Sequence, residues 1–248
     1  MNWFQKQFYA LCDADMALRL THAGRQYEHV KTFKHDFFAA TGLYRAEDDF
    51  IVIKIYRCRG FFGLPMRWLG RRMARHEQRL YRLLEKIEGI PEFLGLVGPT
   101  GFAHSYVPGG NLTVSDSVSD TFFDQLEQIL DKIHRRGAAY VDLDKSQNVL
   151  LGDDGKPHLI DFQISYAPTS NLPGWKQVTQ FFLRQLQTED RYHFSKHKRR
   201  LRPDLLSPED YAKSYQRSPL IRIHRLVSRP YFVLRHLAMD LFDLRAAE

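Results

Sequence analysis

The sequence predicts an α+β protein, with strands concentrated in the first half of the chain and helices in the second. Up to residue 107, short β-prone runs recur between turn signals, with one long helical segment among them. Beyond residue 120, apolar residues recur mainly at helical spacing, interrupted by one hairpin between residues 149 and 160. The 248 residues are enough for one two-lobed domain or for two small domains.

The composition is that of a basic globular protein. Apolar residues make up 44% of the chain, enough for a core, and the net charge of +7 favours anionic partners such as nucleic acid, lipid headgroups or phosphorylated sugars. Cys12 and Cys58 give no disulfide framework and fit a reducing compartment, so we expect a cytoplasmic protein. Asp13 and Asp15 interrupt any apolar run that could act as a secretory signal, and no run reaches the roughly 18 apolar residues of a transmembrane helix.

The first elements are a helix and a pair of strands. Trp3, Phe8 and Leu11 belong to an apolar pattern that predicts a short amphipathic helix over residues 1 to about 24, which packs on the rest of the chain or lies on a membrane surface. Residues 27–44 predict two strands around the turn Lys34-His35-Asp36.

The next strand and helix each carry one charged residue among apolar ones. Residues 50–57 predict a strand whose alternation places Lys54 on one face with Val52 and Tyr56. Residues 66–88 predict a long helix, and Glu77 falls within its apolar stripe. Because a carboxylate on a buried face is costly unless it is paired, we expect an ion pair between Glu77 and Lys54, the alternative being a solvent-facing lysine.

The other faces of the same helix are basic. They form either a solvated surface or a docking surface for an anion, and they carry Arg67, Arg71, Arg72, Arg75, Arg79 and Arg82.

Three polar residues gather around the later hairpin. The turn Gly152–Lys156 joins two short apolar runs, which place Asn148 at the start of one strand and Asp161 at the end of its partner. A preceding loop supplies Asp142, behind a helix with an apolar stripe from Phe122 to Ile133. Two carboxylates and an amide oxygen around one point suit a hard cation such as Mg²⁺.

These residues, in this order, resemble the protein-kinase superfamily. Its pattern is a catalytic-loop Asp followed by an Asn, then a strand pair and Asp-Phe-Gly; here Asp142, Asn148 and Asp161-Phe162-Gln163 occupy those places. The resemblance implies a two-lobed protein-kinase-like fold, with a small N-lobe of antiparallel sheet and one long helix and a mostly helical C-lobe. The expected division is a helical extension over residues 1–24, an N-lobe over 25–106 and a C-lobe over 107–248.

The resemblance also implies roles in binding Mg²⁺ and ATP. Asn148 and Asp161 would hold Mg²⁺, Asp142 would take the acceptor proton, and Lys145 would neutralise the transferring phosphoryl group. The nucleotide would be held by Lys54, paired with Glu77, and by main-chain bonds from Ser105 and Val107 in a hinge-like turn, with His104 behind the pocket and Leu150 as its floor. The turn at residues 34–36 lacks the glycines of the kinase loop, so Lys34 or His35 is expected to contact the phosphates by charge, unless the turn is an ordinary hairpin turn.

The sequence departs from the family at identifiable places. Tyr140-Val141 replaces the usual His-Arg, the step from Asp142 to Asn148 is one residue longer, and Gln163 replaces Gly. No activation-segment end motif follows. These features are similar to the compact bacterial branch that includes kinases of lipopolysaccharide core sugars and RIO-like kinases.

The expected function is therefore transfer of the ATP γ-phosphate to a hydroxyl, with a sugar of an anionic glycolipid as acceptor. A protein serine/threonine kinase and an ATP-binding pseudokinase scaffold remain alternatives. A nucleic-acid-binding protein is disfavoured because the positive charge is spread over several elements and no recognition motif is present.

The last third of the chain adds basic and amphipathic segments. Residues 175–188 predict a helix, and the run from Lys196 to Arg202 is either a solvated loop or an anion site. Residues 219–244 predict two amphipathic helical pieces that pack on the larger lobe or contact the inner membrane face peripherally.

Overall fold

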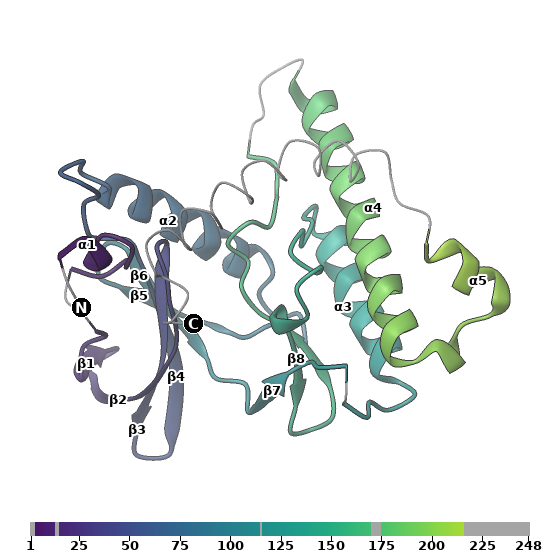
Figure 1. Cartoon of the computed structure of the whole chain (residues 1–248), viewed down its shortest axis with the longest axis horizontal. Coiled ribbons are helices and arrows are strands. Elements are labelled where there is room, and N and C mark those ends of the chain that lie inside the picture. The colour runs from purple at the N-terminus through teal and green to yellow at the C-terminus, as the bar shows by residue number, and fades with distance from the viewer. Residues whose placement is uncertain (1–2, 13–14, 115, 170–174, 216–248) are drawn as a thin grey trace.

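The computed structural model describes residues 3–12, 15–114, 116–169 and 175–215. The expected α+β class is confirmed: a curled antiparallel sheet and α2 lie on one side, and α3, α4 and a small sheet lie on the other (Figure 1). The large sheet has the strand order β1-β2-β3-β4-β6-β5. Its strands are Arg19–His22 (β1), Arg25–His35 (β2), Ala39–Ala46 (β3), Asp49–Tyr56 (β4), Phe93–Val97 (β5) and Gly101–Ser105 (β6).

Strand β4 lies in the interior of this sheet and has apolar neighbours on both faces. Ile51 and Ile53 pack with Leu11 and Met16 of the N-terminal segment, whereas Tyr56 belongs to a second core cluster beneath α2. This alternation follows from the two-residue repeat of a strand. Lys54 is therefore directed to the same side as Tyr56, toward the helix.

Helix α2 (Arg67–Leu83) packs against β4 and β6; it begins where expected but ends before the expected bound at residue 88. Its buried residues include Gly70, Ala74, Glu77 and Leu80. A Cβ at Gly70 would lie 2.0 Å from the main-chain oxygen of Arg57, so only glycine permits this close approach.

The second half of the structure is built from helices and a three-stranded sheet. Residues of α3 such as Phe122 and Leu130 continue the core cluster that Tyr56 and α2 begin, so one core joins the two halves. The elements are β7 (Gly109–Asn111), α3 (Phe122–Arg135), a single 3-10 turn (Ser146–Asn148), β8 (Val149–Gly152), β9 (Pro157–Leu159), α4 (Trp175–Leu201), a second 3-10 turn (Pro203–Leu205) and α5 (Pro208–Lys213).

The prediction of an N-terminal helix over residues 1–24 is wrong. Helix α1 covers only Trp3–Lys6, and residues 19–22 form an edge strand. The buried guanidinium of Arg57 supplies a physical reason, because it donates hydrogen bonds to the carbonyls of Gln7 (2.8 Å) and Tyr9 (3.4 Å). These carbonyls are held by a side chain instead of by helical amides.

The basic run at residues 196–202 is not a loop, since residues up to Leu201 form the last turns of α4. The two helical pieces expected over residues 219–244 lie outside the described residues. None of the helices in the described part of the chain combines the length and hydropathy needed to span a bilayer.

Candidate active site

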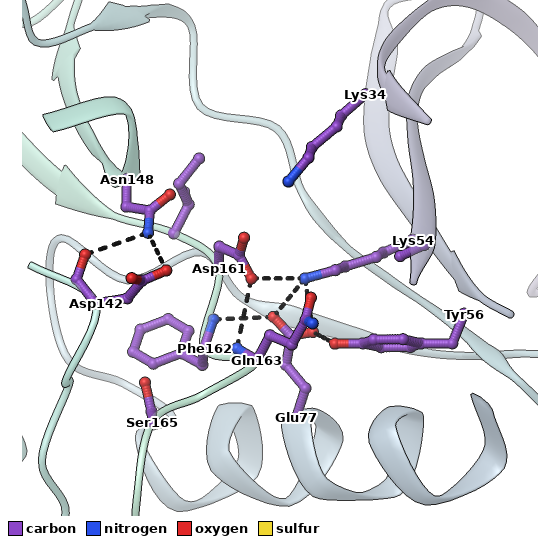
Figure 2. A network of polar contacts seen from close by, with 12 residues as sticks. Lys34, Lys54, Tyr56, Glu77, Asp142, Asn148, Asp161, Phe162, Gln163 and Ser165 are labelled. Carbon is purple, nitrogen blue, oxygen red and sulfur yellow. Dashed lines mark hydrogen bonds and ion pairs between the residues drawn. The ribbon is translucent and has the colours of Figure 1, made fainter. Parts of the chain in front are cut away.

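Lys54 lies at the centre of a buried ionic network. Its ammonium nitrogen is 2.8 Å from Glu77 Oε2 and 2.7 Å from Asp161 Oδ1, so one cation joins β4, α2 and the chain after β9 (Figure 2). Burial opposes the charge on Lys54, but the two carboxylates outweigh burial and raise the pKa of the ammonium. The contact expected between Lys54 and Glu77 therefore forms, and Asp161 joins it.

Glu77 is fully buried and accepts from three donors. Besides Lys54, the hydroxyl of Tyr56 donates to Oε2 and the amide of Phe162 donates to Oε1 at 2.9 Å. Burial raises the pKa of Glu77, while Lys54 acts in the opposite direction. Glu77 thus fixes the backbone immediately after Asp161 as well as the lysine.

Asp161 adopts a backbone conformation that is uncommon for a residue with a side chain. Its φ is +61°, in the left-handed region that Asp tolerates better than most residues. Burial alone would raise the pKa of this carboxyl, but Lys54, assisted by the more distant charge of Lys34, holds it below its usual value. Oδ1 contacts Lys54, and Oδ2 has no partner among the described residues.

Asp142 and Asn148 form the second part of the site. Asn148 Nδ2 donates to Asp142 Oδ2 at 2.8 Å and to the main-chain oxygen of Asp142 at 3.3 Å. Lys145 Nζ donates to the same Oδ2 at 2.8 Å. With its nitrogen engaged in this way, Asn148 leaves Oδ1 without a partner in the described parts of the chain. Both Asp142 and Asp161 lie close enough to Tyr140 to raise the pKa of its phenol, after the larger effect of burial.

The loop before Asp142 contains a strained three-residue turn. The amide of Asp142 donates to the main-chain oxygen of Tyr140 at 2.9 Å, and Val141 between them has a φ of +70°. A β-branched residue at positive φ is an outlier that surrounding contacts must hold in place.

Asp190 of α4 provides those contacts. Its carboxylate is fully buried and accepts from the amides of Tyr140 (2.8 Å) and Val141 (2.7 Å), and it lies 2.9 Å from His134 Nε2. The sequence interpretation missed this residue, although a signal exists. Asp190 falls in the same buried stripe of α4 as Leu183, and a carboxylate within an apolar helical stripe is the signal that identified Glu77.

Tyr56 and Tyr140 are also absent from the sequence-based site. The hydroxyl of Tyr140 donates to the main-chain oxygen of Ile160, and Ser165 Oγ donates to that of Tyr140 at 2.6 Å. These bonds tie the loop that carries Asp142 to the segment around Asp161. Alternation placed Tyr56 beside Lys54, but only the fold shows that its hydroxyl reaches Glu77.

The expected hinge lies after β6, and part of its backbone is already engaged. The amide of Ser105 donates to the Glu92 oxygen at 2.9 Å, while its carbonyl accepts from His104 Nδ1 at 2.9 Å. Burial lowers the pKa of His104 to about 4, so the ring is a neutral donor at pH 7. The amide of Ser105 is therefore not available to a ligand, whereas the amide of Val107 has no partner within the described residues. Leu150 lies on β8 in this region, paired with β7.

Lys34 and His35 are the last residues of β2, and the turn that follows them is held by a carboxylate instead of by glycines. Asp36 Oδ1 accepts from the amides of Phe38 (2.8 Å) and Ala39 (3.0 Å), and Oδ2 lies 2.9 Å from Lys34 Nζ. Lys34 extends from the end of β2 toward Asp161 (Figure 2). The alternative basic residue, His35, has a pKa lowered by burial and contacts the amide of Leu11.

The basic run at the end of α4 is largely engaged within the protein. Lys196 pairs with Asp144, Arg199 Nη1 donates to the Ser214 carbonyl at 2.5 Å, and Arg202 pairs with Asp120 and Asp204. The pKa of Asp144 is lowered by His193 and then Lys196. Lys196, Arg199 and Arg202 are therefore engaged within the protein, whereas Lys198 and Arg200 form no ion pair with a carboxylate of the described residues.

No protein-family model matches the chain, and comparison with the curated proteins finds no significant match. Function is therefore inferred from the side-chain geometry. The structure brings Lys54, Glu77 and Asp161 into one network and Asp142, Asn148 and Lys145 into another, and Tyr140 connects the two. Lys34 extends toward this centre (Figure 2), whereas no hydrogen bond or ion pair joins Ser105, Val107 or Leu150 to it within the described residues.

Proposed function

We propose that the protein is a Mg²⁺- and ATP-dependent phosphotransferase with a two-lobed, protein-kinase-like arrangement. The observation that carries this proposal is Lys54, which contacts Glu77 of α2 and Asp161 after β9 while Asp142 and Asn148 occupy the adjoining loop. In this reading the large sheet with α2 is the smaller lobe. The segment that contains Val107 joins it to the helical lobe.

The oxygen donors of the site fit a hard cation that is shared with a nucleotide. In the described residues no group of three or more His, Cys, Asp or Glu side chains forms a metal site, and Mg²⁺ is commonly bound by one or two carboxylates together with substrate phosphates. Asn148 Oδ1 and Asp161 Oδ2 would hold it. Bound there, Mg²⁺ would neutralise charge on the phosphates and orient them.

The chain's own residues supply the remaining steps. Lys54 is a buried, charged donor for the α- and β-phosphates, and Lys34 adds a positive charge from the end of β2. The acceptor oxygen bonds to the γ-phosphorus as the bond to the β–γ bridging oxygen breaks, and ADP leaves. Asp142 takes the hydroxyl proton, while Lys145 offsets the charge of the transferring group.

A direct test compares Asp142→Asn with Asp144→Asn. We expect Asp142→Asn to lower phosphate transfer at least about a hundredfold, as loss of a general base does, while Mg²⁺–ATP still raises the melting temperature. The lowered pKa of Asp144 makes it a poor base, so Asp144→Asn should retain most activity. Asp153→Asn, in the exposed hairpin turn, is the matched control.

Two results would overturn the assignment. If Asp142→Asn kept more than about a tenth of the activity, a smaller loss than base removal causes, Asp142 is not the base. If the wild-type protein bound Mg²⁺–ATP without turnover, it would be a pseudokinase scaffold.

For the acceptor, we propose a sugar hydroxyl on an anionic glycolipid in preference to a protein serine or threonine. An acceptor that already bears phosphate needs a cationic surface to offset its repulsion from ATP, and this chain is basic overall. Labelled ATP should be offered with purified lipopolysaccharide core and, separately, with extracted cell proteins. Label found only on protein would replace the glycolipid proposal with a serine/threonine kinase.

A further inference from the structure

An apolar turn projects from the sheet side of the molecule, just before α2 (Figure 1). Phe61 and Leu64 exchange main-chain hydrogen bonds of 3.0 and 2.9 Å, which leaves Phe62 and Gly63 at the tip of a two-residue turn. Phe62 has a φ of +47°, a strained value for a bulky residue, and its amide donates to Gln7 Oε1 at 3.1 Å. Phe62 and Leu64 are 44% and 63% exposed, so burial of these side chains does not account for the strain.

Two exposed tryptophans accompany this turn: Trp3 contacts it, and Trp68 follows it closely in the sequence. Trp3 of α1 packs edge-on against Phe62 at 5.9 Å, and Trp68 lies in the first turn of α2. Both indole side chains are more than half exposed. Isolated exposed apolar residues are normal in soluble proteins, but a contiguous group marks an interaction site. We call Trp3, Phe62, Leu64 and Trp68 the aromatic patch.

A basic helix face adjoins the aromatic patch. The exposed arginines Arg67, Arg71, Arg72 and Arg75 follow it along α2, and the printed sequence has no Asp or Glu from residue 57 to residue 76. None of these four arginines forms an ion pair with a carboxylate of the described residues. Like charges four residues apart destabilise a helix slightly, so this arrangement is not explained by the stability of α2.

We propose that the aromatic patch and these arginines dock the protein on an anionic lipid bilayer. The aromatic and leucine side chains would enter the interfacial region, and the guanidinium groups would pair with lipid phosphates. A bilayer suits the shape, because the patch is a protruding turn and a lipid surface accommodates protruding apolar groups. Nucleic acid would satisfy the arginines, but its surface offers no apolar interior for Leu64.

The position of α2 connects this surface with the candidate active site. His76 Nε2 donates to the Ser165 carbonyl at 2.9 Å, and Arg79 donates to that of Ala167 at 2.7 Å. The helix that begins at the patch is therefore bonded to the segment after Asp161. This step rests on the proposed function: docking would hold that segment near a lipid-borne acceptor and would restrict the acceptor to a membrane lipid.

The test is co-sedimentation of the full-length protein with phosphatidylcholine vesicles that contain or lack phosphatidylglycerol. We expect binding only to the anionic vesicles. Phe62→Gly combined with Leu64→Ser should weaken binding at least about tenfold, because apolar area stays in water. Glycine also suits the positive φ at residue 62, so the variant should remain folded. Leu96→Ser on β5, where the side chain is 54% exposed, is the apolar control.

The electrostatic part is tested by Arg67→Gln, Arg71→Gln and Arg72→Gln together. Each arginine near an anionic surface contributes about a fivefold effect, so the triple variant should bind about a hundredfold more weakly. Arg45→Gln, on the exposed part of β3, is the control. With Trp175→Phe as background, the emission of Trp3 and Trp68 should shift to shorter wavelength when vesicles are added.

Failure of this proposal is distinguishable from failure of the proposed function, because binding requires no ATP. Asp142→Asn should bind vesicles as the wild type does, whether or not the protein is a kinase. The docking proposal is wrong if the wild type ignores anionic vesicles, or if the patch variants bind as tightly as their controls. Binding that depends on the arginines but not on Phe62 and Leu64, together with tight binding of single-stranded RNA, would replace the bilayer with nucleic acid.

Discussion

Replacing Lys54 by methionine separates the structural role of the ion pair from its chemical role. The substitution conserves much of the volume but leaves Glu77, which is fully buried, and Asp161 without their shared cation. Removing one partner of a buried ion pair typically costs about 3–5 kcal/mol in the free energy of unfolding. Asp161 is partly solvated, so we expect about 3 kcal/mol, the lower end of that range.

The informative variant is Lys54→Met combined with Glu77→Gln. Glutamine removes the uncompensated charge but keeps an oxygen that can accept from the amide of Phe162. The double variant should therefore be more stable than Lys54→Met alone, by about 1–2 kcal/mol. Denaturant unfolding followed by far-ultraviolet circular dichroism measures this difference. If the proposed function is correct, phosphate transfer should stay at least about a hundredfold below wild type in both variants, since neither restores the cation that we propose binds phosphate.

The dependence of stability on pH provides a second check. In Lys54→Met the pKa of Glu77, already raised by burial, loses the opposing effect of the lysine and rises further. A group whose folded-state pKa exceeds its unfolded value destabilises the protein as the pH rises through the folded value. The stability deficit of Lys54→Met should therefore shrink as the pH falls toward about 4, the ordinary carboxyl range. A double variant no more stable than the single, with a deficit independent of pH, would refute the ion-pair account.

Two further variants test residues that surround this centre. Asp190→Asn should lower kcat about tenfold or more with little change in KM for ATP, because asparagine places an NH2 group where one carboxylate oxygen accepts from the Tyr140 or Val141 amide. A lower denaturation midpoint together with a raised KM would instead indicate a purely structural role. His104→Asn keeps a donor for the Ser105 carbonyl but removes a group with a pKa of about 4, against 6.5 when unfolded. With that depressed pKa, the wild-type folded state loses stability as the pH falls from 6.5 to 4. In parallel unfolding titrations over this range, the variant should therefore lose about 3 kcal/mol less in the free energy of unfolding than wild type. An unchanged dependence of that free energy on pH would contradict burial of a neutral ring.

The ion pair that sequence reasoning placed correctly in space joins two locally anomalous residues. Lys54 and Glu77 are charges within apolar patterns, and a charge in such a position requires a partner wherever the chain folds. The expected α+β class and most strand positions follow from periodicity for a similar reason, since alternation specifies which residues are buried. Asp142 and Asn148 meet because a short loop and a tight hairpin leave them few other positions.

The features that were missed depend on contacts between segments far apart in the sequence. Asp190 acts on Tyr140 and Val141 from 50 and 49 residues away, respectively. The N-terminal segment shows the same limit. Its apolar pattern suits a helix, but the buried guanidinium of Arg57, 48–50 residues later, captures its carbonyls. Such tertiary contacts override local propensity and leave little trace in the residues that they constrain.

The candidate site is consequently held as much by bonds from side chains to the backbone as by bonds between side chains. Val141 and Asp161 both have positive φ values, and a buried carboxylate accepts a hydrogen bond from the backbone at each place. Asp190 accepts from the amide of Val141, and Glu77 accepts from the amide of Phe162, the residue after Asp161. A non-glycine residue in that region costs about 1–3 kcal/mol unless its surroundings enforce it. The two buried carboxylates offset this cost by fixing the backbone in both parts of the candidate site. Because Glu77 also contacts Lys54, a change in the position of α2 would alter the lysine and the Asp161 backbone together.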